Sequence, residues 1–298
     1  MSVPNFDLAA MVQTVSQSPD YRVLRRLQPR EITKPNAGTE HRIGMVLDVE
    51  TTGLDTGKDE VIELGMVKFA YLPSGEVTHI VDVYEAFNEP SIAIPPEIVE
   101  LTGITDDMVA GHRIPEDDVI RFASDAVVVI AHNANFDRRF CERFWPMFES
   151  THWACSATQI EWRKLGFEGS RLAYLLAGCG YFHDKHRAAD DCRALLEVIA
   201  SKPSDCSKTA LALMLECARK PSIRVWAEHA PYELRDVLKK RKYRWNDGSD
   251  GRAKSWFVDV DEEGHEAELK FLHQEIYRRE VDLRSERITA LLRFSKRA

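Results

Sequence analysis

The sequence lacks the features of a membrane-embedded or disulfide-bonded protein. No apolar run in the 298 residues approaches the roughly eighteen that a membrane-spanning helix needs. Residues 1–7 lack the basic start and apolar stretch of a secretory signal. Six cysteines are present, but none forms a C-x-x-C pair, which argues for reduced thiols rather than a zinc site or a disulfide framework. We therefore expect a cytoplasmic protein with no membrane partner.

Positive charge is also in deficit, with 40 Lys and Arg against 48 Asp and Glu and a net charge of −8. The deficit is uneven, because residues 221–298 have 17 basic and 15 acidic residues. No arginine-rich tract typical of RNA binding is present. This balance argues against tight, nonspecific coating of duplex nucleic acid. It does not argue against phosphodiester chemistry, provided that divalent ions neutralise part of the site.

Acidic residues are present where they are unfavourable for stability. Asp48 and Glu50 directly follow the apolar run 43–47, and Asp137 comes shortly after the apolar run 126–130. Ionised groups beside an apolar core raise the free energy of the fold unless they are paired or bound to metal. Asp48 and Glu50 are two residues apart on a predicted strand, so their side chains project to one face. Carboxylates that converge from several elements predict a site for a hard cation such as Mg²⁺ or Mn²⁺.

Three sequence blocks follow one another in a characteristic order. They are D-x-E-T-T-G-L at 48–54, H-N-A-x-F-D at 132–137 and H-x-A-x-x-D at 186–191. From residue 43 to about 200 the chain thereby resembles the DEDDh group of 3′→5′ exonucleases, the family of the proofreading epsilon subunit of DNA polymerase III. The resemblance implies an α/β, ribonuclease-H-like exonuclease fold, which is a mixed sheet with flanking helices.

The resemblance also implies the site. Two Mg²⁺ ions, for which Mn²⁺ can substitute, would be held by four carboxylates, and His186 would act as the general base. The metal ligands would be Asp48, Glu50, Asp137 and Asp191. Substrate contacts are expected from Thr51, Thr52, Leu54, His132, Asn133 and Phe136. Each assignment has a structural alternative: strand-end or first-turn acids for the carboxylates, a surface histidine for His186, and core packing for Phe136. Asp190 is expected to be a solvated helix acid and Glu63 a buried structural partner.

The predicted reaction is hydrolysis of phosphodiester bonds from the 3′ end of single-stranded or frayed DNA, with release of nucleoside 5′-monophosphates. An exoribonuclease or oligonucleotide hydrolase is the alternative enzyme, because the same five residues would serve RNA. A polymerase-associated binding subunit with secondary nuclease activity is the alternative from another class. The partners are therefore a nucleic-acid 3′ end, DNA rather than RNA, and a DNA polymerase as a further candidate.

The order of predicted elements divides the chain into four parts: a helical N-terminal extension at 1–40, the exonuclease domain at 41–203, a helical linker at 204–222, and a small α+β accessory domain at 223–298. In the extension, helices are predicted around Leu8–Val15 and again after Ser18. Residues 239–245 of the accessory domain mix basic and aromatic side chains. That mixture could bind single strands, but we favour the alternative of a solvated helix end with its aromatics in the core.

Overall fold

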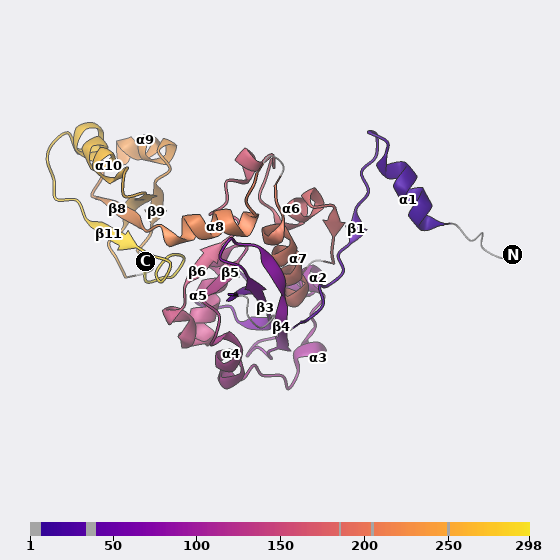
Figure 1. Ribbon diagram of the computed structural model, residues 1–298. Coiled ribbons are helices and arrows are strands. Elements are labelled where there is room, and N and C mark those ends of the chain that lie inside the picture. Colours follow the sequence, from indigo (N-terminus) through magenta and orange to yellow (C-terminus); the bar gives the residue numbers. More distant parts are fainter. Residues whose placement is uncertain (1–6, 34–39, 185, 204–205, 249–250) are drawn as a thin grey trace.

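The computed structural model describes residues 7–33, 40–184, 186–203, 206–248 and 251–298 (Figure 1). Apart from one sheet of only two short strands, two separate sheets organise the described residues. The larger has the strand order β4-β3-β2-β5-β6, in which β2, β3 and β4 are antiparallel and β5 and β6 run parallel to β2. Its strands are β2 (Arg42–Thr51), β3 (Val61–Tyr71), β4 (Val77–Phe87), β5 (Val128–Ala131) and β6 (Trp153–Cys155). The sheet is thus mixed, as predicted. We call the part built on it the N-terminal core.

Helices cover both faces of this sheet. On one face, α6, α7 and α8 pack against residues such as Val46 and Val67. On the other, α4 and α5 cover Met45, Leu47 and Val129. The helices of the N-terminal core are α2 (Pro96–Thr102), α3 (Asp106–Val109), α4 (Glu116–Ala123), α5 (Ala134–Phe144), the 3₁₀ segments η1 (Pro146–Ser150) and η2 (Trp162–Leu165), α6 (Leu172–Gly178), α7 (Ala188–Ala200) and α8 (Ala210–Arg219). Every residue of β3 is buried, so the sheet is sandwiched between two apolar layers.

A second, four-stranded sheet with the order β11-β8-β10-β9 forms the C-terminal module. All its neighbouring strands are antiparallel, and it has its own buried cluster around Val225, Leu238 and Leu272. Its elements are β8 (Ser222–Glu228), η3 (Tyr232–Leu234), α9 (Arg235–Lys240), β9 (Arg244–Asn246), β10 (Ser255–Val260), α10 (His265–Phe271), the π-helix η4 (Leu272–Tyr277) and β11 (Ser285–Ile288). The α8 helix, which precedes the module, packs its apolar side into the N-terminal core.

The segment after β11 returns to the N-terminal core. The backbone N–H of Trp153 in β6 donates to the carbonyl of Ala290, with an N···O distance of 3.0 Å. Arg138 of α5 is fully buried and donates to the carbonyls of Ala290, Leu291 and Arg293. We call residues 289–298 the C-terminal tail. Through this segment the module is fastened to the helix that follows β5.

The N-terminal extension differs from its prediction. The first helix is confirmed as α1 (Leu8–Ser16), which has no buried residue and stands apart from the sheets in Figure 1. The helix predicted after Ser18 is wrong. The chain there is extended, and β1 (Arg25–Arg26) pairs in parallel with β7 (Tyr181–Phe182). Arg22 donates to the carbonyl of Ala177 and Arg26 pairs with Asp184, so tertiary contacts override the helical spacing of the apolar residues. The part of the extension at 1–6 and 34–39 lies outside the described residues.

In the C-terminal module α10 gives way to η4, and the chain turns at Arg278, which has a positive φ of 55°. The short strands β6 and β11 were not predicted, since three or four residues offer too little periodicity. Within the described residues, no helix has the length and apolar character to cross a membrane.

Candidate active site

Two of the predicted ligands lie on β2, the strand at the middle of the larger sheet. Asp48 and Glu50 are partly buried, two residues apart, and are opposite Gly65 and Glu63 of β3. The pairing register shifts between Glu50 and Thr51, so β2 ends in an irregularity directly behind the two acids. On its other side β2 pairs in parallel with β5, so the chain that continues from β5 into α5 begins beside the same end of β2.

Asp137 approaches the acidic end of β2 from α5. The helix begins at Ala134, three residues beyond the end of β5, and Asp137 lies in its first turn with an exposed fraction of 3%. Burial raises the pKa of Asp137 to about 7, although the backbone N–H groups of Asp137 and Val49 act in the opposite direction. The fourth acid, Asp191, lies in the first turn of α7.

A glycine permits α7 to approach the sheet. A Cβ atom on Gly65 would lie 2.4 Å from the backbone carbon of Ala188 and from the backbone nitrogen of Ala189. The Sγ atom of Cys192 also contacts the carbonyl oxygen of Gly65 at 3.3 Å. Gly65 is the register partner of Asp48, so the contact brings the start of α7, and with it Asp191, to the acidic end of β2. Only a residue without a side chain allows this packing.

Burial and the charges of neighbouring acids both perturb the titration of Asp48 and Glu50. Burial is the main cause that raises the pKa of Asp48 well above its usual range, and the charges of Asp137, Asp191 and Glu50 raise it further. Burial raises the pKa of Glu50 to about 8, with contributions from Asp191, Glu63 and Asp137, whereas only Arg187 lowers it. Clustered acids without enough cations are unfavourable in the folded protein. Oxygen-only donors of this kind suit a hard divalent cation, which would reverse the repulsion.

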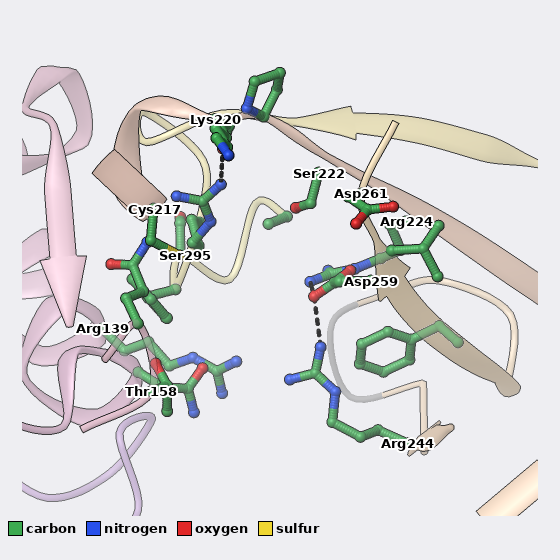
Figure 2. Close-up of a pocket in the computed structure, with 18 of the residues that line it drawn as sticks. Arg139, Thr158, Cys217, Lys220, Ser222, Arg224, Arg244, Asp259, Asp261 and Ser295 are labelled. Atoms are coloured by element: carbon green, nitrogen blue, oxygen red, sulfur yellow. Dashed lines mark hydrogen bonds and ion pairs between the residues drawn. The ribbon is translucent and has the colours of Figure 1, made fainter. Parts of the chain in front are cut away.

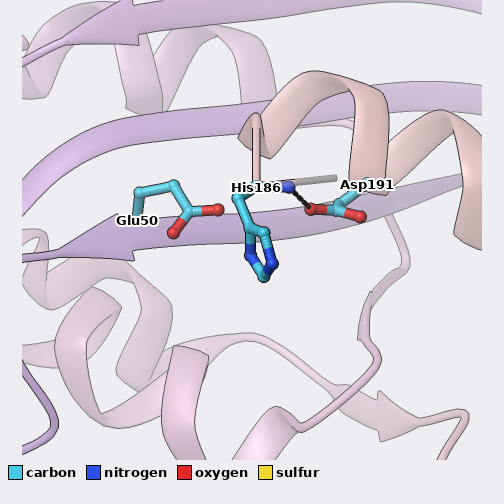
Figure 3. Close-up of side chains that lie close together, drawn as sticks. All are labelled: Glu50, His186 and Asp191. Atoms are coloured by element: carbon cyan, nitrogen blue, oxygen red, sulfur yellow. Dashed lines mark hydrogen bonds between the residues drawn. The ribbon is translucent and has the colours of Figure 1, made fainter. Parts of the chain in front are cut away.

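The loop before α7 places His186 beside this cluster (Figure 3). One ligand atom each from Glu50, His186 and Asp191 lie within 4.8 Å of one another. The backbone N–H of His186 donates to Oδ2 of Asp191 at 2.9 Å. His186 has a positive φ of 65°, a strained conformation for a residue other than glycine. His186 thus lies in the loop before α7 and not on the helix itself.

A second histidine belongs to the same neighbourhood and was not found from the sequence. Nε2 of His183 lies 2.6 Å from Oδ1 of Asp191, and the side chain of His183 is largely buried. Both oxygens of Asp191 thus have partners in the loop before α7. The spacing of three residues between His183 and His186 was the available signal, but it falls outside the H-x-A-x-x-D block.

The base of α7 is held by a buried ion pair. Glu63 is fully buried, accepts the backbone N–H of Ala188 at 2.9 Å and pairs with Arg187, also at 2.9 Å. Its expected role as a buried structural partner is confirmed, because it satisfies a free N–H at the start of the helix. Asp190 pairs with Arg193 on the outer side of α7, as a solvated helix acid would.

The residues expected to contact substrate have different surroundings. Thr51 and Thr52 are buried, and Oγ1 of Thr52 accepts the backbone N–H of Glu60 at 2.9 Å. Leu54, in contrast, is 83% exposed and stands beyond the end of β2. An apolar side chain so exposed, four residues after Glu50 in the chain, is available to a ligand.

The other three substrate candidates come from the end of β5. The ring nitrogens of His132 lie 2.8 Å from Oγ of Ser156 and 2.6 Å from the carbonyl oxygen of Ser170, and burial lowers its pKa. His132 therefore joins two loops, and its hydrogen-bonding capacity is already used. Asn133 is exposed, whereas Phe136 packs on Phe140 with ring centroids 4.9 Å apart.

The mixed sheet, its flanking helices and the acids at the end of its central strand define the ribonuclease-H-like exonuclease class of fold. Residues 45–199, a little over half of the chain, match the family described as Exonuclease (RNase_T). The chain belongs to this family.

Curated relatives carry the names of replication proteins. The chain is 36% identical over 168 residues to the "DNA polymerase III PolC-type" of Thermotoga maritima, which covers 52% of this chain and 11% of that protein. It is 33% identical over 173 residues to "DNA polymerase III subunit epsilon" of Treponema pallidum, covering 54% of this chain and 77% of that protein. The chain therefore spans about a ninth of the PolC-type relative and most of the epsilon subunit.

Solved structures of exonucleases are also similar. "Exonuclease X in complex with 5′ overhanging duplex DNA" has 23% identity and a TM-score of 0.41, and covers 57% of this chain and 98% of that one. "Exonuclease I (apo)" has 14% identity and a TM-score of 0.44, and covers 62% of this chain and 50% of that one.

Proposed function

We propose that this chain is a metal-dependent 3′→5′ exonuclease that hydrolyses single-stranded or frayed DNA and releases nucleoside 5′-monophosphates. The observation that carries the proposal is the convergence of four carboxylates from β2, α5 and α7 on one place, with the pKa values of three of them raised. Membership of the exonuclease family supports the reaction type.

Asp48, Glu50, Asp137 and Asp191 would hold the divalent ions, for which the oxygen-only donor set fits Mg²⁺ or Mn²⁺. When bound, such ions supply Lewis-acid stabilisation of the charge that develops on the phosphate oxygens. The protein itself fixes the acids: β2 sets Asp48 and Glu50 on one face, and Gly65 sets the distance of α7.

His186 is the general base in this proposal. His186 lies in the loop before α7, and its ring stands between the side chains of Glu50 and Asp191 (Figure 3). From there it can accept a proton from the attacking water. The hydrogen bond from its backbone N–H to Asp191 fixes the loop relative to the ligand acids. The exposed side chain of Leu54 and the edge of Phe136 would meet the terminal nucleotide, whereas His132 would act by positioning the loops.

The same acids would also hydrolyse RNA, so an exoribonuclease or oligonucleotide hydrolase is the second candidate. A binding subunit that contacts a DNA polymerase is the third; the name of the epsilon relative favours a polymerase as partner and a cytoplasmic site of action. The proposed division into an exonuclease domain at 41–203 and an accessory domain at 223–298 rests on the two sheets with separate buried clusters.

The test is degradation of matched DNA and RNA oligomers that are labelled at the 5′ end, with Mg²⁺, Mn²⁺ or EDTA. The wild-type protein should shorten the DNA from its 3′ end, and EDTA or Asp191→Ala should stop it. Asp190→Ala is the matched control, because it removes the neighbouring acid on the outer side of the same helix turn. Equal activity of the Asp191→Ala and Asp190→Ala proteins would refute the site, and faster shortening of RNA would promote the second candidate.

A further inference from the structure

The large cleft between the N-terminal core and the C-terminal module is not part of the candidate active site (Figure 2). Neither the four acids nor His186 are among the described residues that line it. Arg224 and Arg244, which do line it, both pair with Asp259. The contacts that fix the loop before α7 come instead from the N-terminal extension.

The extension supplies a strand partner to the segment that leads into this loop. Strand β1 pairs in parallel with β7. The backbone N–H of Arg25 donates to the carbonyl of Gly180 at 2.9 Å, and that of Leu27 donates to the carbonyl of Phe182 at 2.8 Å. Among the described residues, β1 is the only strand that pairs with β7. The extended conformation of β7 therefore depends on the extension.

Side chains of the extension fasten it to β7 and to α7. Arg26 pairs with Asp184, and its guanidinium group lies 5.1 Å from the ring centroid of Phe182. Arg30 makes two hydrogen bonds to the carboxylate of Glu197 on α7. The Arg26 pair is exposed and contributes little free energy by itself, whereas the Arg30 pair is partly buried. The extension thus joins β7 to the helix that carries the fourth acid.

His183 follows β7 directly and contacts that acid. Its Nε2 atom lies 2.6 Å from Oδ1 of Asp191, and its side chain is only 6% exposed. An ionised carboxylate only accepts hydrogen bonds, so Nε2 is the nitrogen that carries the proton. Oδ2 of Asp191 accepts the backbone N–H of His186. The two hydrogen bonds restrict rotation of the carboxylate and leave lone pairs on both oxygens for a cation.

The two histidines of this loop have different surroundings and therefore different roles. His183 is largely buried and its Nε2–H is directed at Asp191, so it is not placed to take a proton from water. His186 is partly buried, and its ring stands between Glu50 and Asp191 (Figure 3). Carboxylates that bind metal ions are commonly held by such hydrogen bonds, and loss of the partner typically weakens metal binding by about 10- to 100-fold.

We propose that the N-terminal extension is a positioning element of the active site: β1 fixes β7, β7 places His183, and His183 orients Asp191 to bind a divalent ion. The inference rests on the proposed exonuclease function. It extends the site beyond residues 45–199, which match the exonuclease family. His183 acts through Asp191 and is therefore a positioning residue.

The test is calorimetric titration of the full chain with Mn²⁺ alone. His183→Leu removes both ring nitrogens and retains an apolar group of similar size, so Mn²⁺ affinity should fall by about 10- to 100-fold. His183→Gln keeps an N–H donor at the same number of bonds from the backbone and should retain most of the affinity. His265→Leu removes a histidine that bonds Ser285 in the C-terminal module, so it is the matched control and should leave the affinity unchanged. Melting temperatures in EDTA establish that each variant folds.

A proline in β1 tests the extension itself. Arg25→Pro removes the N–H that donates to Gly180, so Mn²⁺ affinity should fall, but by less than in His183→Leu because the effect passes through β7. Leu24→Pro is the matched control, because among the described residues the N–H of Leu24 makes no hydrogen bond to β7. In the double variant Arg25→Pro/His183→Leu the loss should equal that of His183→Leu alone, since both changes act on Asp191 by one route.

Three results would overturn the proposal. The first is an equal affinity in His183→Leu and His183→Gln, because the N–H of residue 183 would then have no role in ion binding. The second is an equal affinity in Arg25→Pro and Leu24→Pro, and the third is losses that add in the double variant. Failure of the proposed exonuclease function is seen separately, as absence of both Mn²⁺ binding and hydrolysis in the wild-type protein.

Discussion

Asp137 and Arg138, two consecutive residues of α5, are both buried ionisable side chains, but their surroundings are opposite. Asp137 faces other acids, and burial raises its pKa to about 7. Arg138 faces the C-terminal tail, pairs with Glu142 at 2.7 Å and donates to three carbonyl oxygens. Both side chains are almost inaccessible to solvent. The difference lies entirely in the partners that the fold supplies.

Helix α5 therefore carries both a residue of the candidate site, Asp137, and a residue that stabilises the fold, Arg138. Arg138 has the partners that a buried guanidinium needs, so its side of α5 fastens the tail to the core. Among the described residues Asp48, Glu50 and Asp137 form no ion pair, so these three acids reduce stability unless cations bind. Where a fold keeps an unfavourable cluster beside a satisfied one, the unfavourable cluster is the better candidate for a functional site.

The largest expected effect comes from Asp137→Asn. Activity should fall by about 10³-fold or more, since a bound metal contributes several kcal/mol to transition-state stabilisation. The melting temperature in EDTA should rise, because the substitution removes one of four repelling acids. Steady-state hydrolysis measures the activity, and differential scanning fluorimetry measures the melting temperature. A lower melting temperature would mean that Asp137 is a structural acid.

Arg138→Ala should destabilise the folded protein, whereas Asp137→Asn should stabilise it in EDTA. It leaves Glu142 buried without its main partner and three carbonyls without a donor, so unfolding free energy should fall by about 3–5 kcal/mol. Arg121→Ala, which breaks an exposed pair with Asp118, is the control and should cost at most about 0.5 kcal/mol. Urea denaturation measures both, and similar losses would show that the tail contact contributes little.

Gly65→Ala tests geometry without changing any charge. The new methyl group would collide with the backbone of α7, so stability should fall by about 1–3 kcal/mol and Asp191 should move away from Asp48. Divalent-ion affinity, measured by calorimetry, should therefore fall together with activity. An alanine at Gly75, which approaches Ala212 of α8 instead, is the control: it should destabilise without changing ion affinity. Unchanged affinity in Gly65→Ala would separate α7 from the site.

The smallest effect is on the pH dependence of stability. The pKa of Glu50 is raised from 4.5 to about 8, so between these values the folded protein retains a proton that the unfolded chain has lost. Stability in EDTA, measured as the melting temperature, should therefore decrease as the pH rises from about 5 to about 8. Glu50→Gln should flatten this dependence, and Mg²⁺ should restore stability most at the upper end. A melting temperature that rises over this interval would contradict the raised pKa.

How much of this could be predicted depends on the range of the interactions. Asp48 and Glu50 were placed on one face by the two-residue period of a strand, and Asp137 and Asp191 by first-turn positions, all of which are local patterns. The close approach at Gly65, the contact of His183 with Asp191 and the partners of Arg138 could not be predicted. Each joins elements that only the folded chain brings together. The extended segment after Ser18 failed as a prediction for the same reason, because its conformation depends on pairing with β7.

The contacts of Arg138 also bear on how the molecule unfolds. They join residues that are 152 to 155 positions apart in the chain, and they tie the C-terminal tail, which directly follows β11, to the helix that follows β5. If the C-terminal module and its tail unfolded first, the buried guanidinium of Arg138 in the N-terminal core would lose its carbonyl acceptors. The two sheets, although separate in their hydrogen bonding, should therefore behave as one cooperative unit, with a single melting transition and an active-site helix that is only as stable as the tail that holds it.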